Sequence, residues 1–168
     1  MPIIEGAMGA PQIISGAPGA GTDEVQTVTV TDTPTGGDFR LSYGMQVTGA
    51  IAFDANAAAV DAALEALSSI GAGGVTVGGG PLPGAAVTVT FTGNHGKRAL
   101  KQLLVLANNS LTGGTNPTVT IEKTTAGVDA SARGAAKGTL LIDADAGELY
   151  INTGTSVAPT FVKAGTQS

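Results

Sequence analysis

The chain has 168 residues, enough for one domain of about 100 residues with appendages. Charged residues make up 12% of it, about half the usual share, and 26 of its residues are Gly, so the composition favours a repetitive or structural protein over an enzyme. The net charge is −5 and the eight Lys and Arg residues are scattered, which leaves no basic stripe to follow a nucleic-acid backbone and makes anionic membranes poor partners.

Residues 1–22 are predicted to form an extended arm. A ten-residue pattern occurs twice in the arm, each copy opening on an Ile pair, and its Gly and Pro residues exclude a helix. Regularly spaced apolar side chains can dock on a neighbouring protein and become ordered on binding, whereas the alternative is a disordered terminus. The candidate partner-binding residues are Pro2, Ile3, Ile4, Pro11, Ile13 and Ile14.

Residues 23–127 are predicted to form an α+β module. Apolar and polar residues alternate over segments 25–31, 39–43, 49–53, 75–77, 87–91 and 119–122, which predicts strands. Residues 54–71 carry the one clean helical period. The apolar stripe of this helix consists of Val60, Ala63, Leu64, Leu67 and Ile70.

The sequence also indicates where the predicted helix begins and ends, and what residues 100–107 and 128–137 form. Asp54 or Asn56 can cap the helix start, and Gly71 can end it in the left-handed conformation. Residues 100–107 fit either a second short helix or a buried strand. Residues 128–137 are expected to be a linker.

Residues 138–168 are predicted to be a small C-terminal β-hairpin unit. Strands at 140–142 and 149–151 flank a turn at 143–147, and a third strand is expected at 161–162. So short a hairpin is marginal alone and needs the main domain, a symmetry mate or another protein against its face. The candidate oligomer contacts are Leu149, Tyr150, Ile151 and Phe161. The fold class is therefore α+β, mostly antiparallel sheet with one main amphipathic helix.

No catalytic, cofactor or metal site is predicted. The single His95 lies in a loop-like stretch, and the chain has no Cys. Asp143 and Asp145 resemble a calcium loop, but the Gly comes early and no bidentate Glu follows, so a hairpin turn is the better interpretation. The Gly-rich stretch 78–84 lacks the Lys of a phosphate loop. The basic residues at 97, 98 and 101 could contact an acidic capsid surface, but a solvated helix face is the favoured interpretation.

Two stretches resemble a known group of proteins. Residues 23–127 contain EVQTVTVTDTPTGGDFRLSYG, the segment from Ala57 to GAGGVTV, and LTGG at 111–114, and they resemble a module of tailed-bacteriophage structural proteins. Residues 137–166, KGTLLIDADAGELYINTGTSVAPTFVKAGT, resemble the C-terminal unit of phage head-fibre proteins, with Phe161 where Trp is usual. The resemblance implies a virion structural protein, and it implies a homotrimer.

The expected function is therefore non-enzymatic decoration of a phage capsid. The arm would bind the major capsid protein at the outer surface of the head, and the protein would be made in the cytoplasm of the bacterial host. A tail-tube or tail-fibre protein is the first alternative. A host-glycan adhesin is the second, and the absence of Trp counts against it. No signal peptide and no apolar run of about 20 residues is present in the sequence, so no membrane partner is expected.

Overall fold

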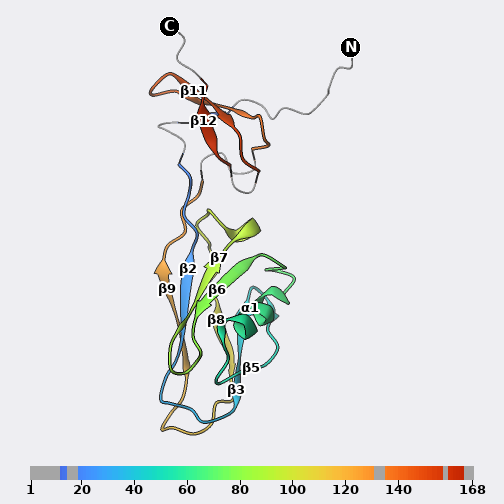
Figure 1. Cartoon of the computed structure of the whole chain (residues 1–168), viewed down its shortest axis with the longest axis vertical. Coiled ribbons are helices and arrows are strands. Elements are labelled where there is room, and N and C mark those ends of the chain that lie inside the picture. Colours follow the sequence, from blue (N-terminus) through green and yellow to red (C-terminus); the bar gives the residue numbers. More distant parts are fainter. Residues whose placement is uncertain (1–11, 15–18, 131–134, 157–158, 165–168) are drawn as a thin grey trace. The chain divides into compact units, whose positions relative to one another are not determined.

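The computed structural model describes residues 12–14, 19–130, 135–156 and 159–164 (Figure 1). The chain divides into two compact units, of which the central unit spans Thr22–Val128. The terminal unit combines the residues up to Gly21 with Asp129–Ser168. Thr22 and Val128 close the central unit, because the backbone N–H of each donates to the carbonyl of the other at 2.9 Å. This unit extends one residue beyond the predicted module at each end.

The central unit consists of two antiparallel sheets and one helix (Figure 1). The first sheet has the order β6 (Val75–Gly79), β7 (Val87–Phe91), β2 (Val25–Val30) and β9 (Val119–Thr125). In the second sheet β3 (Asp38–Tyr43) pairs with three other strands, which are β4 (Gln46–Val47), β5 (Ile51–Ala52) and β8 (Val105–Asn109). The strand predicted at 49–53 is therefore shorter than expected.

One hydrophobic core joins both sheets to the helix. Every second residue of β2 and β7 is buried, because successive strand side chains point to opposite faces. The core residues with no exposed surface include Val28, Phe39, Leu41, Val60, Leu64, Val87, Val89 and Phe91. The alternation predicted for these strands is confirmed, and so is the apolar stripe of the helix.

The helix α1 (Ala57–Glu65) is shorter than the predicted 54–71. Asn56 is its N-cap, since its side-chain oxygen accepts a hydrogen bond of 2.9 Å from the Ala59 N–H. After Glu65 the backbone continues in turns. The Leu67 N–H donates to the Leu64 carbonyl, three residues back, at 3.1 Å, and the Ser69 N–H donates to the Gln46 side chain at 2.7 Å. The apolar stripe nevertheless stays buried beyond the helix end, at Leu67 and Ile70.

Replacing the Asn56 cap by alanine is expected to lower the free energy of unfolding by about 0.5–2 kcal/mol, because the first turn loses the acceptor for one of its free N–H groups. Urea denaturation followed by circular dichroism measures the change. Asn56→Asp keeps an acceptor at the same position and serves as the control. Equal losses in both variants would contradict a capping role.

The segment 100–107 contains a strand and no second helix. Strand β8 pairs with β3, and Leu104, just before β8, is buried while Val105 keeps 57% of its surface exposed. The prediction of a helix face for Lys97, Arg98 and Lys101 is wrong, because this stretch begins with a short 3-10 turn, Gly93–His95, and continues in bends. The segment contains a strand because it pairs with β3, although its Leu residues have helical spacing.

The LTGG segment forms a turn that requires its glycines. Gly113 and Gly114 have positive φ angles of 79° and 66°, which L side chains rarely adopt. A Cβ atom at Gly114 would lie 1.9 Å from the Asp32 carbonyl oxygen. Close backbone packing therefore explains why this motif carries two consecutive glycines.

The terminal unit contains one four-stranded sheet of order β1 (Gln12–Ile14), β10 (Leu140–Asp143), β11 (Glu148–Asn152) and β12 (Phe161–Lys163). The β1–β10 pair is parallel and the other pairs are antiparallel. The hairpin and its third strand, predicted at 161–162, are confirmed. The predicted class, α+β with mostly antiparallel sheet, is confirmed as well. Among the described residues, no helix is long and apolar enough to cross a membrane.

Candidate assembly surface

The turn between β10 and β11 fixes the register of the terminal sheet. Asp143 Oδ1 accepts hydrogen bonds from the backbone N–H groups of Asp145 and Ala146 at 3.0 and 3.2 Å. Gly147 closes the turn with a φ of 66°, a conformation that suits glycine. Asp143 therefore acts as a turn residue, as predicted. In the described ranges, no three His, Cys, Asp or Glu side chains form a group that could hold a metal ion.

This register places five aliphatic side chains on one face of the sheet. Leu140, Ile151 and Val162 are cross-strand neighbours in one row, and Ile142 and Leu149 form the next row. The exposed fractions are 38% for Ile142, 39% for Leu149, 37% for Ile151 and 54% for Val162. We call these five residues the aliphatic face. A monomer gains nothing by leaving such a contiguous apolar surface in water, so this face indicates an interaction site.

The opposite face of the same sheet contains the buried residues and several side-chain hydrogen bonds. Leu141 is fully buried there. Glu148 accepts hydrogen bonds from Lys163 and from the Tyr150 hydroxyl, and both bonds lower the pKa of its carboxyl group. Asn152 is also fully buried, and its amide donates to the Ala135 carbonyl at 2.8 Å. The side chains of Glu148, Tyr150 and Asn152 therefore have hydrogen-bond partners inside the unit, whereas the aliphatic face has no polar side chain.

The structure separates the four residues predicted to contact another subunit. Leu149 and Ile151 belong to the aliphatic face, whereas Tyr150 and Phe161 lie on the opposite side by register. Sequence reasoning missed three members of the face, which are Leu140, Ile142 and Val162. The alternation Leu140-x-Ile142 was the signal, but only the hairpin register aligns it with Leu149 and Ile151.

The structure describes only some of the arm residues that were predicted to bind a partner. Ile13 and Ile14 lie on β1, where Ile13 is paired with Ile142 and Ile14 with Asp143. Pro2, Ile3, Ile4 and Pro11 lie outside the described residues. The second copy of the repeat thus supplies an edge strand of the terminal sheet.

A pocket of about 300 Å³ lies in the central unit, lined by Tyr43, Ser69, His95, Arg98, Leu100, Lys101 and Gln102. His95 Nε2 carries the proton, because it lies 2.8 Å from the Ser69 carbonyl oxygen, which can only accept. The imidazole ring also packs edge-on against Tyr43 and Phe91. His95 is therefore held as part of the pocket wall.

Tyr43 beside this pocket is expected to titrate above pH 10.0. Burial raises the pKa of the Tyr43 hydroxyl, the charge of Glu24 raises it further, and Arg98 opposes the shift. The pKa of the Tyr43 hydroxyl is higher in the folded chain than in the unfolded chain. Its neutral form therefore adds to the stability of the fold below pH 10, and this contribution is lost as pH rises through the folded pKa. A phenolate absorbance titration of Tyr150→Phe, which leaves Tyr43 as the remaining tyrosine, measures the midpoint.

The same titration in urea provides the control for Tyr43, with a midpoint near the ordinary value of 10.0. A native midpoint equal to the unfolded one would contradict the burial of this hydroxyl. Tyr43→Phe is expected to flatten the alkaline loss of stability.

The chain matches no protein-family model. It is 35% identical over 152 residues to a protein named "Tail sheath protein" from Mycobacterium phage Bxz1. That alignment covers 86% of this chain and 24% of the relative, so the chain spans about a quarter of the relative's length. A solved chain from Mycobacterium phage Patience matches 84% of this chain and 49% of its own length, at 20% identity and a TM-score of 0.46.

The likeness in sequence supports a structural protein of a bacteriophage virion, which is the class expected from the motifs. The finer expectation, a place on the capsid surface, is not what the relative's name describes. That name puts the relative in the tail, which was the first alternative.

Proposed function

We propose that this chain is a structural module of a phage tail and that its role is mechanical. The observation that carries the proposal is the 35% identity to a tail sheath protein over 86% of the chain. Because the module corresponds to only 24% of that relative, the proposal concerns one module and not the contraction or the complete assembly of a sheath. The low content of charged residues fits a protein whose surface is used for contacts with other subunits.

The aliphatic face is proposed to contact further copies of this chain. None of its five residues is charged, so its partner must be apolar too, and the same face of another copy meets this requirement. In the homotrimer implied by the family resemblance, three such faces would meet around a threefold axis. Burying apolar surface stabilises such a contact by about 25 cal/mol per Å².

Labelling of intact virions tests the location. We expect gold particles, coupled to an antibody that was raised against the purified chain, to mark tails in electron micrographs. Gold on the heads would overturn the tail proposal and would support the alternative, a decoration protein bound to the major capsid protein. Binding of the purified chain to heads that lack it would then identify the partner.

Sedimentation equilibrium of the purified chain tests the homotrimer. We expect a mass of three chains at micromolar concentration. A monomer at every concentration measured would overturn self-association through the aliphatic face, while leaving the location in the tail to the labelling experiment.

A further inference from the structure

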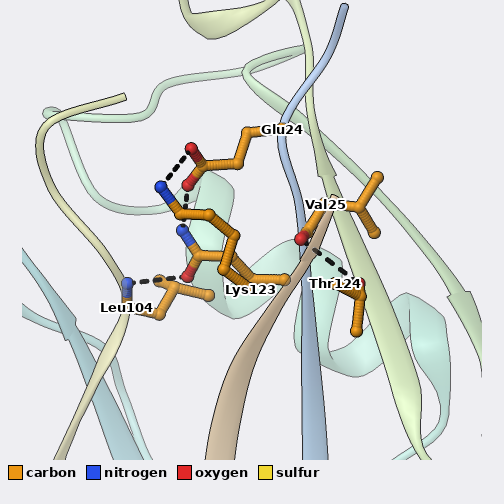
Figure 2. Close-up of polar contacts among 6 residues, drawn as sticks. Glu24, Val25, Leu104, Lys123 and Thr124 are labelled. Atoms are coloured by element: carbon orange, nitrogen blue, oxygen red, sulfur yellow. Dashed lines mark hydrogen bonds and ion pairs between the residues drawn. The ribbon is translucent and has the colours of Figure 1, made fainter. Parts of the chain in front are cut away.

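A polar cluster of three side chains crosses the first sheet of the central unit. Glu24 precedes β2 and Lys123 lies on the edge strand β9 (Figure 2). Gln26 lies on β2 itself. Gln26 and Lys123 are register partners, so their side chains share one face of the sheet. Glu24 and Gln26 have no exposed surface, whereas the Lys123 side chain keeps 33%. The lysine therefore enters a buried polar site from the sheet edge.

A single carboxylate holds the two nitrogen atoms of this cluster. Glu24 Oε1 accepts a hydrogen bond of 2.7 Å from Gln26 Nε2, and Glu24 Oε2 lies 2.9 Å from Lys123 Nζ (Figure 2). Oε2 accepts no further hydrogen bond among the described residues. One carboxylate oxygen of Glu24 thus contacts the Lys123 nitrogen, and the other contacts the Gln26 amide nitrogen.

The carbonyl of the same amide is polarised from the other side. Gln26 Oε1 accepts a hydrogen bond of 2.9 Å from the backbone N–H of Leu104. A fixed N–H group at a carbonyl oxygen stabilises the negative charge that develops there when a nucleophile adds to the carbon. The cluster therefore combines an amine, a proton acceptor, an amide and an oxyanion donor.

We propose that Lys123 and Gln26 join in an intramolecular isopeptide bond, with Glu24 as the proton shuttle. Amides are inert toward free amines in water. Well-oriented neighbouring groups, however, react with effective molarities of about 10⁵–10⁸ M. The sheet register and the shared carboxylate provide that orientation here.

The reaction balances without any further reagent. Glu24 Oε2 takes a proton from the Lys123 ammonium, and the free amine adds to the Gln26 amide carbon, so that Oε1 becomes an oxyanion facing the Leu104 N–H. Glu24 then delivers its proton to Nε2 and accepts the second proton of Nζ. The carbon–Nε2 bond breaks, ammonia leaves with the electron pair, and the carbonyl forms again as a secondary amide.

The product would tie the edge strand β9 covalently to β2. These two strands otherwise hold together through non-covalent contacts, which are backbone hydrogen bonds, side-chain packing and the hydrogen bonds of the Thr124 hydroxyl to Val25 and Thr27. An edge strand has a partner on one side only, so a pulling force on the unit separates it first. The bond would remove this weak point whatever the virion location of the chain.

Mass spectrometry of the purified, denatured full chain tests the proposal. We expect the wild-type protein to be lighter than its encoded sequence by the mass of one ammonia molecule. After trypsin digestion, residues 1–40 should remain joined to residues 102–133, because a modified Lys123 is not cleaved. Glu24→Gln and Lys123→Arg should both show their full encoded masses and separate peptides.

Lys163→Arg is the matched control, since Lys163 is also ion-paired with a glutamate, in the terminal unit. It should retain the loss of ammonia. Wild-type protein of full encoded mass would overturn the proposal, and so would an ammonia loss without the joined peptides. A bond that persists in Glu24→Gln would overturn the role of Glu24. The mass is read on denatured protein, so a variant that folds poorly still leaves the wild-type result decisive.

Discussion

Replacing Phe91 by alanine is expected to lower the free energy of unfolding of the central unit by about 3–5 kcal/mol. Phe91 has no exposed surface, and its ring lies 5.4 Å from that of Tyr43 and 6.1 Å from that of His95, centroid to centroid. Truncation removes the apolar contacts of the ring and leaves a cavity that close-packed neighbours fill only in part. Guanidinium denaturation followed by circular dichroism measures the loss.

Phe53→Ala is the matched control for this core substitution. Phe53 follows β5 and is only half-buried, so the same change in chemistry removes less buried area and is expected to have well under half the effect. Equal losses in the two variants would contradict the placement of Phe91 at the centre of the core. A loss at Phe91 alone would show that the packing between the two sheets carries the stability.

Replacing Ile151 by aspartate is expected to abolish self-association of the chain. Ile151 is the middle residue of a row on the aliphatic face, between Leu140 and Val162. A carboxylate buried there without a partner costs several kcal/mol, which opposes the contact between copies. Ile151 is 37% exposed in the single chain, so the fold itself should tolerate the change. Sedimentation equilibrium measures the oligomeric state, and circular dichroism verifies the fold.

Ala144→Asp controls for the added charge, because Ala144 is exposed in the turn between β10 and β11. This variant is expected to associate like the wild-type chain. Undiminished association of Ile151→Asp would contradict the assignment of the aliphatic face as the contact between copies. Loss of association in both variants would mean that net charge controls assembly, and not the apolar contact.

Local sequence accounts for the strands and for the start of the helix. Val28, Leu41 and Val89 lie on the apolar side of the alternation that predicted these strands, and each has no exposed surface. The cap at Asn56 followed from its short polar side chain, which needs only its own neighbours in sequence to act. These features depend on residues a few positions apart, so a single sequence is sufficient to predict them.

Contacts between distant segments decided the other features. Beyond the helix end at Glu65, the Ser69 N–H donates to Gln46, which lies 23 positions before it, so that the helix does not continue through the predicted 66–71. Segment 100–107 contributes a strand because β3 offers a free edge to β8. Neither Gln46 nor β3 can be identified as a partner from the spacing of residues in the segment that it binds.

The sequence by itself determined the α+β class, the strand alternation and the apolar stripe of the helix, because these follow from periodicity. Only the tertiary structure decided which residues form the aliphatic face and that Gln26 faces Lys123. Both depend on strand register, and a shift of one residue would move every side chain to the other face of the sheet. The turn at Asp143 and the pairing along all of β2 set that register, and pairing between strands about 100 residues apart has no local signal.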